Sequence, residues 1–152
     1  MDAHRAVILV VEDDVSQQEL TVTALRHIGV TQPVHCVSGA NDGIVYVDAG
    51  GQYIDRVAFP CPRLIITGIQ MDGGDGFALL RHLKNQPSKY SCPVLVFTSM
   101  DNEPHIIQAR ALGASAYIIK PMTFDKTCEV LRGHCRPFLN LPEISPSVTS
   151  RS

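Results

Sequence analysis

Several signatures that would assign a function are missing from this chain of 152 residues. Lys and Arg do not outnumber the acidic residues, and a net charge of −2 offers no basic stripe, so we expect no nucleic-acid partner. The short run before the first apolar stretch cannot form a signal peptide or a membrane span. We therefore expect a cytoplasmic protein without a membrane partner.

The cysteine pattern excludes two further classes of protein. The chain has five cysteines, an odd number, and no CxxC, so neither a disulfide framework nor a zinc site is indicated. Cys128 and Cys135 are seven residues apart and would share a helix face. We interpret them as core thiols, because free Cys behaves as a small hydrophobe.

Length and composition predict one globular domain with a core of its own. The chain is 45% apolar and 18% charged, as in ordinary folded proteins. We assign residues 1–138 to this domain. Residues 139–152 are rich in Pro and Ser, and we expect them to form a disordered C-terminal tail.

Five short apolar runs without alternation predict strands that are buried on both faces. They are residues 7–11, 34–37, 64–67, 94–97 and 116–119. Each run is followed by a segment with helical spacing of apolar residues. Strands that alternate with helices form a parallel sheet through right-handed crossovers. The expected fold is α/β, a flavodoxin-like doubly wound (βα)5 with a five-stranded parallel sheet.

Polar residues follow the predicted strands at the points where the strands end. Glu12 and Asp13 follow the first strand, Thr98 closes the fourth, and Lys120 follows the fifth. In such sheets the functional crevice lies beyond the carboxyl ends of the strands. These residues suit a phosphate-handling site, but the position after the third strand, where a nucleophilic Asp would stand, holds Gly68.

In this order the motifs resemble the receiver domain of two-component response regulators, the CheY-like family. The resemblance covers roughly residues 5 to 138. It is carried by VVEDD at 10–14, IQM at 69–71 with DG at 75–76, FTS at 97–99 and GASAYIIKP at 113–121. The long loop before the third strand and the absence of a second domain resemble a narrower group, the stand-alone regulators paired with phytochrome-type histidine kinases.

The resemblance implies a mechanism and a set of site residues. A histidine kinase or phosphotransfer protein would donate a phosphoryl group to an Asp at the third strand. Mg²⁺ would be held by Glu12, Asp13 and the backbone carbonyl of Gln70. Three further residues would bind the phosphoryl group or report its presence: Thr98, Tyr117 and Lys120. Phosphoryl transfer depends mainly on positioning and charge neutralisation.

The departure from the family at Gly68 changes these expectations. Glycine supplies neither a nucleophile nor a ligand, so we expect no acceptor and weak Mg²⁺ binding. Lys120 would then pair with Glu12 or Asp13. Asp72 could replace part of the lost charge, whereas Thr67 would point to the opposite face of the sheet. Whether the bond before Pro121 is cis is left open.

Each of these residues also has a plainer interpretation. Residues 12–14 could be a capped loop, and Lys120 could be a surface residue before a turn. Thr98 could be a hydroxyl at the edge of the core. Tyr117 could be an amphipathic aromatic residue at a strand end. The partners across the predicted sheet favour the site interpretation.

Three functions remain open at this stage. The first is a signalling module that is degenerate at Gly68 and binds an effector protein through the fourth helix, fifth strand and fifth helix, with a homodimer left open. The second is an ordinary Mg²⁺-dependent, phospho-accepting regulator in which Gly68 is an isolated variant, natural or engineered. The third is an unrelated enzyme on the same scaffold. We expect no enzyme, because the sequence has neither GxSxG nor a P-loop.

Overall fold

The computed structural model describes residues 7–87 and 90–142. Its five strands form one parallel sheet in the order β2-β1-β3-β4-β5. The strands are β1 (Val7–Val11), β2 (Val34–Val37), β3 (Pro62–Thr67), β4 (Val94–Thr98) and β5 (Ala116–Ile119). The helices are α1 (Val15–His27), α2 (Ala40–Val47), the 3-10 turn η2 (Gly51–Tyr53), α3 (Gly76–Lys84), α4 (Glu103–Ala111) and α5 (Phe124–Cys135). The predicted doubly wound fold is confirmed.

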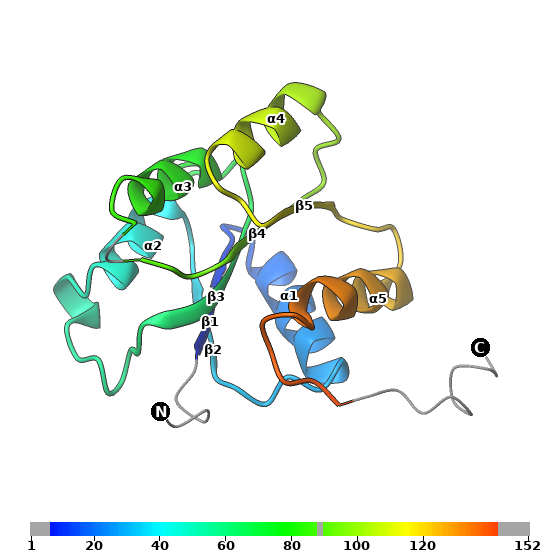
Figure 1. Cartoon of the computed structure of the whole chain (residues 1–152). Helices are drawn as coiled ribbons and strands as arrows, with labels where there is room; N and C mark the ends of the chain where they lie inside the picture. The colour runs from blue at the N-terminus through cyan, green and yellow to red at the C-terminus, as the bar shows by residue number, and fades with distance from the viewer. Residues whose placement is uncertain (1–6, 88–89, 143–152) are drawn as a thin grey trace.

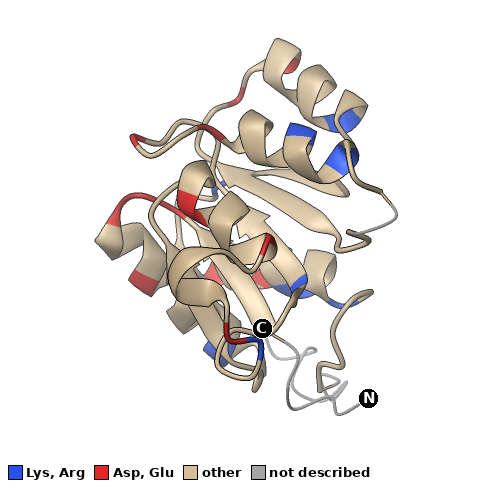
Figure 2. Cartoon of the chain, turned by 90° about the vertical axis from the view of Figure 1, so that its left-hand side faces the viewer, with Lys and Arg blue, Asp and Glu red and all other residues tan. Residues whose placement is uncertain are grey.

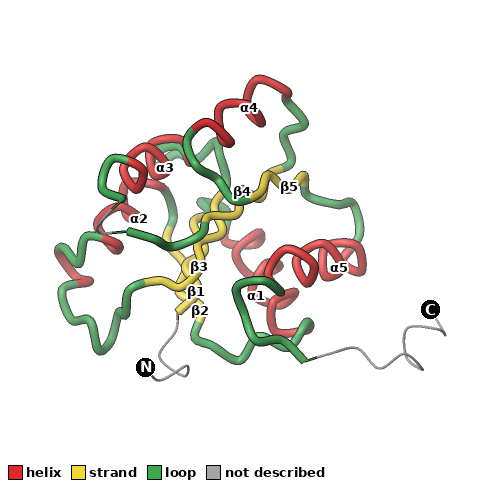
Figure 3. Tube along the Cα trace, viewed as in Figure 1, coloured by secondary structure: helices red, strands yellow, loops and turns green. Residues whose placement is uncertain are grey.

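Helices cover both faces of the sheet, which explains why the strands read as continuous apolar runs. Helices α2, α3 and α4 lie on one face, and α1 and α5 lie on the other (Figures 1 and 3). In β1, Leu9 packs against the side chains of α2 and α3 on one face, and Ile8 packs against those of α1 and α5 on the other. Both residues are fully buried. The strand order reverses between β1 and β3, so their carboxyl ends flank the crevice of the fold.

Local sequence signals fix where the helices begin and end. Four helices start at a polar residue whose side chain accepts a hydrogen bond from a backbone N–H three residues later: Asp14, Asp75, Asn102 and Thr123. After α1 and α4 the backbone turns at Gly29 and Gly113, with φ of 103° and 92°. These positive angles suit glycine, so both stops are encoded in the sequence.

The long connection between α2 and β3 is ordered by side-chain contacts. The buried Tyr46 hydroxyl donates to the Pro60 carbonyl at 3.1 Å. Arg56 donates to the carbonyls of Val47 and Phe59 at 2.6 and 2.9 Å. Strand β3 begins at Pro62, two residues earlier than the sequence suggested.

The predicted domain end at residue 138 falls too early. Leu139 and Leu141 are buried in the layer that contains α1 and α5. Arg132 donates to the carbonyl of Pro142 at 3.0 Å, which holds the end of this segment. Residues 139–142 therefore pack with the folded domain, because Leu139 and Leu141 are buried in this layer. The rest of the predicted tail lies outside the described residues.

Two further observations concern the helices. Cys128 and Cys135 are buried in the α5 layer, as expected of core thiols. Among the helices that the structure describes, none is both long enough and apolar enough to cross a lipid bilayer.

Candidate functional site

The carboxyl ends of the strands enclose a cavity of about 300 Å³. Five of the predicted site residues line it: Glu12, Gly68, Gln70, Thr98 and Lys120. Asp13 lies beside this cavity without lining it, and Tyr117 reaches it only through a contact with Met100. Figure 2 shows the Lys and Arg residues of α3 and α4 at the C-terminal ends of these helices, away from the carboxyl edge of the sheet.

Lys120 points into the cavity and pairs with Glu12. Its Nζ lies 3.0 Å from Glu12 Oε1 and 3.1 Å from Gln17 Oε1. The side chains of Lys120 and Glu12 are only 19% and 13% exposed, so salt screens this pair less than a surface pair. The expectation that Lys120 would turn to one of the two acids therefore agrees with the geometry.

Asp13 is held as an anion next to this pair. The hydrogen bond with the Glu12 carboxyl group lowers the pKa of Asp13 from its usual value, and the backbone N–H of Asp72 lowers it further. That N–H donates to Asp13 Oδ2 at 3.2 Å. The positive charge of Lys120 acts in the same direction. Two acidic side chains and one lysine side chain therefore meet at the ends of β1 and β5.

Gly68 is not required by the backbone. Its φ lies outside the left-handed region that favours glycine, and its N–H donates to the Val11 carbonyl at 3.0 Å. A Cβ atom added here would lie 3.7 Å from Met71 Sδ and 3.9 Å from Glu12 Oε1, which are ordinary contacts. At Gly76, by contrast, a Cβ would lie 2.2 Å from the Gly68 carbonyl oxygen. The fold needs glycine at 76 but tolerates a side chain at 68.

Thr98 and Tyr117 both hold the segment that follows β4. The Thr98 hydroxyl oxygen accepts a bond from the Met100 N–H at 3.2 Å, and the Tyr117 hydroxyl donates to the Met100 carbonyl at 2.7 Å. Burial raises the pKa of Tyr117, so it stays a neutral donor. The hydroxyl proton of Thr98 remains available to a group in the cavity.

The donor set suits a hard cation but is short of one carboxylate. Glu12, Asp13 and the Gln70 carbonyl offer the oxygen atoms that Mg²⁺ prefers. Across residues 7–87 and 90–142, no three His, Cys, Asp or Glu residues come close enough to hold a metal ion. Asp72 therefore does not complete the set, although its N–H contacts Asp13. Thr67 is buried and donates to the Gly68 carbonyl at 2.9 Å, away from the acids.

Two features of the site carry no signal in the sequence. Gln17 holds Lys120 from the first turn of α1, and an amide there has no distinctive spacing. Thr98 and Tyr117 bind Met100 through its backbone N–H and carbonyl, so the identity of its side chain gives no signal. The peptide bond between Lys120 and Pro121 is trans, as are all the described peptide bonds.

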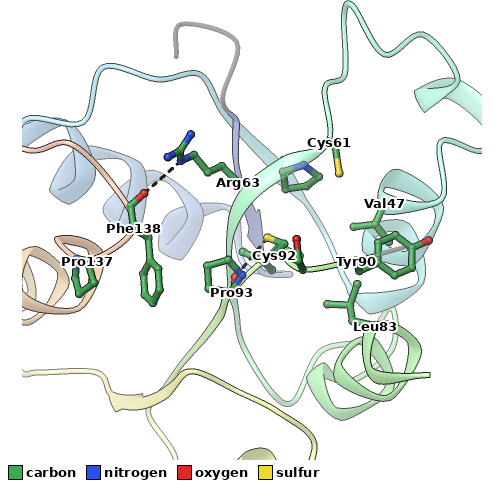
Figure 4. Close-up of a pocket in the computed structure, with 12 residues that line it drawn as sticks. Val47, Cys61, Arg63, Leu83, Tyr90, Cys92, Pro93, Pro137 and Phe138 are labelled. Carbon is green, nitrogen blue, oxygen red and sulfur yellow. Dashed lines mark hydrogen bonds between the residues drawn. The ribbon is translucent and has the colours of Figure 1, made fainter. Parts of the chain in front are cut away.

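A second cavity, of about 410 Å³, lies at the opposite end of the sheet (Figure 4). Cys61, Arg63, Cys92 and Phe138 are among the residues that line it. Arg63 is the charged side chain in this lining, and its Nε donates to the Phe138 carbonyl at 3.3 Å. Burial raises the pKa of the Cys92 thiol to about 12. This cavity offers space and thiols but no cluster of charges.

A doubly wound sheet with acids and a lysine at its carboxyl edge defines a class of small α/β modules that bind phosphate or metal ions beyond the strand ends. Residues 8–132 match the family model of the response regulator receiver domain, and the chain belongs to this family. Receiver domains are signalling modules that interact with histidine kinases or phosphotransfer proteins and with effectors, and in general they bind Mg²⁺.

Similar proteins include both longer regulators and regulators of comparable length. The transcriptional regulatory protein ZraR of Klebsiella oxytoca is 31% identical over 126 residues, which cover 83% of this chain but 25% of that protein. The response regulator Rcp1 of Synechocystis is 24% identical over 127 residues, 84% of each chain. The chain thus spans about a quarter of some relatives and most of others.

Solved structures confirm the fold. A response regulator in red light signaling of R. palustris superposes with a TM-score of 0.81 at 20% identity, over 91% of this chain and 99% of that one. The phosphorylated cyanobacterial phytochrome response regulator RcpA gives 0.79 at 24% identity, over 91% and 99%. A Mn²⁺-bound form of Rcp1 gives 0.77 at 23% identity, over 91% and 99%.

Proposed function

We propose that this chain is a receiver-type signalling module that works through protein contacts and does not accept a phosphoryl group at position 68. The observation that carries the proposal is the geometry around Gly68. A Cβ atom would make only ordinary contacts there, yet glycine has no side-chain oxygen that could attack a phosphoryl donor. Lys120, which would answer the phosphoryl charge, is paired with Glu12 instead.

The binding face proposed for the partner comprises α4, β5 and α5. Ile107 on α4 is 59% exposed and Ile119 on β5 is 40% exposed. Helix α4 buries only Ala109, and β5 lies at the edge of the sheet, so this face has little cover of its own. Exposed apolar side chains on such a face support binding to another protein, which we take to be a kinase, a phosphotransfer protein or an effector in the cytoplasm.

A phytochrome-type histidine kinase is the partner that we favour. Support comes from Rcp1, which is similar over most of both chains, and from the bacteriophytochrome response regulator RtBRR. RtBRR superposes with a TM-score of 0.74 at 25% identity, over 95% of this chain and 87% of that one. Mg²⁺ would be held by Glu12, Asp13 and the Gln70 carbonyl, and only weakly, because the third carboxylate is missing.

Intact mass after incubation with acetyl phosphate and Mg²⁺ tests the proposal. We expect no change for the chain itself and one added phosphoryl group for Gly68→Asp. Gly68→Asn is the matched control, since its side chain has the same size but no carboxylate, and it should stay unmodified. A phosphoryl group on the chain itself would overturn the proposal, and Asp72→Asn would then show whether Asp72 is the acceptor.

The room above Gly68 favours one second candidate, an ordinary phospho-accepting regulator in which Gly68 is an isolated variant. An otherwise intact site is what a single recent change would leave. This candidate requires Gly68→Asp to accept the phosphoryl group and also to bind Mg²⁺ tightly. If Gly68→Asp does neither, the site has changed elsewhere and this candidate is wrong.

A further inference from the structure

The connection between α2 and β3 is fixed by its own side chains. Tyr53 of η2 is buried, with its ring centroid 4.8 Å from that of Tyr46 and 5.1 Å from that of Phe59. The Asp55 carbonyl accepts from the Phe59 N–H at 2.8 Å, and Asp55 Oδ1 accepts from the Val57 N–H at 2.9 Å. A loop that is ordered beforehand loses little conformational entropy when a partner binds it. The connection is therefore suited to form a binding surface.

Three aliphatic side chains remain on the outside of this connection. Ile54 is 75% exposed, Val57 is 79% exposed, and Val45 of α2 is 38% exposed. Val45 lies against the start of η2, because a Cβ added at Gly50 or Gly51 would be 3.4 or 3.6 Å from Val45 Cγ1. Ile54 follows η2 directly, so the three side chains share one stretch of surface. Aliphatic groups gathered in this way mark a contact surface.

The charges around these side chains are mostly negative. Residues 40–59 contain three aspartates and a single cation, Arg56. Asp42 and Asp55 are exposed. The Arg56 guanidinium donates to two backbone carbonyls, at 2.6 and 2.9 Å, so it is bound within the connection. This side of the molecule, which faces the viewer in Figure 2, therefore presents an apolar centre with an acidic border.

The acidic border continues beyond the start of α2. The N–H groups of Ala40 and Asn41 donate to carbonyls of the loop 72–75, at 3.1 and 2.9 Å. This loop carries the exposed Asp72 and Asp75. A second copy of the chain placed face to face on this surface would bring like charges together, and an anionic lipid surface would also be repelled. Charge complementarity instead favours a basic partner.

We propose that the outer surface of the α2–β3 connection binds a partner protein through a segment that carries apolar side chains between Lys or Arg residues. The apolar side chains would cover Ile54 and Val57, and the cations would lie against Asp42 and Asp55. This surface lies on the opposite side of the molecule from α4 and β5 (Figure 1). The inference is therefore independent of the proposed function, and the chain would have two separate binding faces.

Nuclear magnetic resonance titration of the whole chain with a synthetic amphipathic peptide of Leu and Lys residues tests this inference. We expect the peptide to shift the amide signals of residues 45–57. The same peptide with Glu in place of each Lys should leave these signals unchanged, because it carries the wrong charge. Signals that do not move within residues 45–57, or shifts confined to α4, β5 and α5, would overturn the proposal.

Substitution of the exposed aliphatic side chains makes the test specific. Ile54→Ser combined with Val57→Ser should weaken binding of the Leu and Lys peptide at least about tenfold, as for removal of the central anchors of an interface. Both side chains are largely exposed, so the fold should persist. Ile107→Ser on α4 is the matched control and should keep the affinity. If only Ile107→Ser weakens binding, the peptide uses the face named under the proposed function, and this inference is wrong.

Substitution of the aspartates separates the contribution of charge. Asp42→Asn combined with Asp55→Asn should weaken binding about fivefold at low salt, and the difference should shrink at high salt. Asn at position 55 keeps an oxygen that can accept from the Val57 N–H, so the turn is preserved. Unchanged affinity at low salt would overturn the proposal.

Two further measurements examine other occupants of the surface. Sedimentation of the chain alone should show no association that depends on Ile54 and Val57. Vesicles containing phosphatidylserine should bind the parent chain and the Ile54→Ser, Val57→Ser variant equally poorly. A dimer that the two substitutions dissociate would assign the surface to a second copy, and vesicle binding that they abolish would assign it to a membrane. Either result would overturn the proposal.

Discussion

The two ends of the sheet hold cavities that differ in content more than in size. The larger, of about 410 Å³, lies at the amino ends of β3 and β4, where Arg63 is bound to a backbone carbonyl and Cys92 is kept neutral. The smaller, of about 300 Å³, lies at the carboxyl ends and holds Lys120 against Glu12. Chemistry follows the placement of charge, so volume is a poor guide to the functional site in this fold.

The direction of the helices explains this difference. In a parallel α/β sheet the helices begin near the carboxyl ends of the strands and finish near the amino ends. Helix N-termini favour anions and C-termini favour cations. The chain follows this rule, with Asp14 and Asp75 capping α1 and α3, and Lys84 and Arg132 in the last turns of α3 and α5. The carboxyl edge is thus suited to oxygen ligands and phosphate chemistry.

The largest difference that we predict is between two thiols of the amino-end cavity. Cys61 is exposed, whereas burial raises the pKa of Cys92 to about 12. At pH 8 only about one Cys92 thiol in 10,000 would be ionised, and the thiolate is the reactive form. We expect Cys92 to be alkylated at least about a hundredfold more slowly than Cys61, as measured by peptide mass spectrometry. Equal rates would mean that this cavity is chemically active after all.

The next prediction concerns residues 139–142, the buried segment that follows α5. A chain that ends at residue 138 loses the buried side chains of Leu139 and Leu141. We expect it to unfold at lower urea concentration, with a loss of about 3 kcal/mol or more, as for deletion of buried leucines. A chain that ends at residue 142 is the matched control, because it keeps both leucines. Equal stability of the two chains would show that the segment is dispensable.

That segment also shows where prediction from sequence fails. The strands and caps were predictable because their signals are local, as at Asp14 and Gly29. Leu139 and Leu141 lie between prolines in a short stretch without periodicity, so their burial depends on tertiary packing alone. The domain end was therefore placed too early.

The site shows the same limit. Topology sufficed to bring Lys120 to Glu12, because the carboxyl ends of parallel strands share one edge of the sheet. Gly68, after β3, and Gly76, at the start of α3, nevertheless differ in a way that the sequence hides. Only the backbone around them reveals that a side chain is excluded at Gly76 and tolerated at Gly68. The choice between a required glycine and a lost carboxylate could not have been made from sequence alone.

Two substitutions that each delete a tyrosine hydroxyl compare the connection before β3 with the carboxyl edge of the sheet. We expect smaller losses of stability than for the truncation. Tyr46→Phe removes a donor from the half-buried Pro60 carbonyl and the partner of His35 Nδ1, at 3.1 and 2.8 Å. Tyr117→Phe removes one bond to Met100 at a half-buried site. We expect losses in unfolding free energy of about 1–3 kcal/mol for the first and about 0.5–1 kcal/mol for the second. Urea unfolding measures both, and the reverse order would contradict the greater burial of Tyr46.

The smallest effect that we predict is the acid sensitivity conferred by Asp13. Its pKa is lowered in the folded chain by the hydrogen bond with Glu12 and by the Asp72 N–H. A carboxyl group with a lowered pKa stabilises the fold above its ordinary value of 3.8, and that contribution is lost as pH falls through the folded pKa. Asp13 is only partly buried, so solvent screens its interactions and the contribution is small.

Asp13→Asn isolates this contribution at the carboxyl edge. Asn cannot titrate, so the stability of the variant should fall less steeply than that of the parent chain as pH drops from 5 to about 2. Urea unfolding at each pH gives the slopes. A steeper fall in Asp13→Asn would show that the folded chain favours the protonated acid, and that like charges dominate this edge.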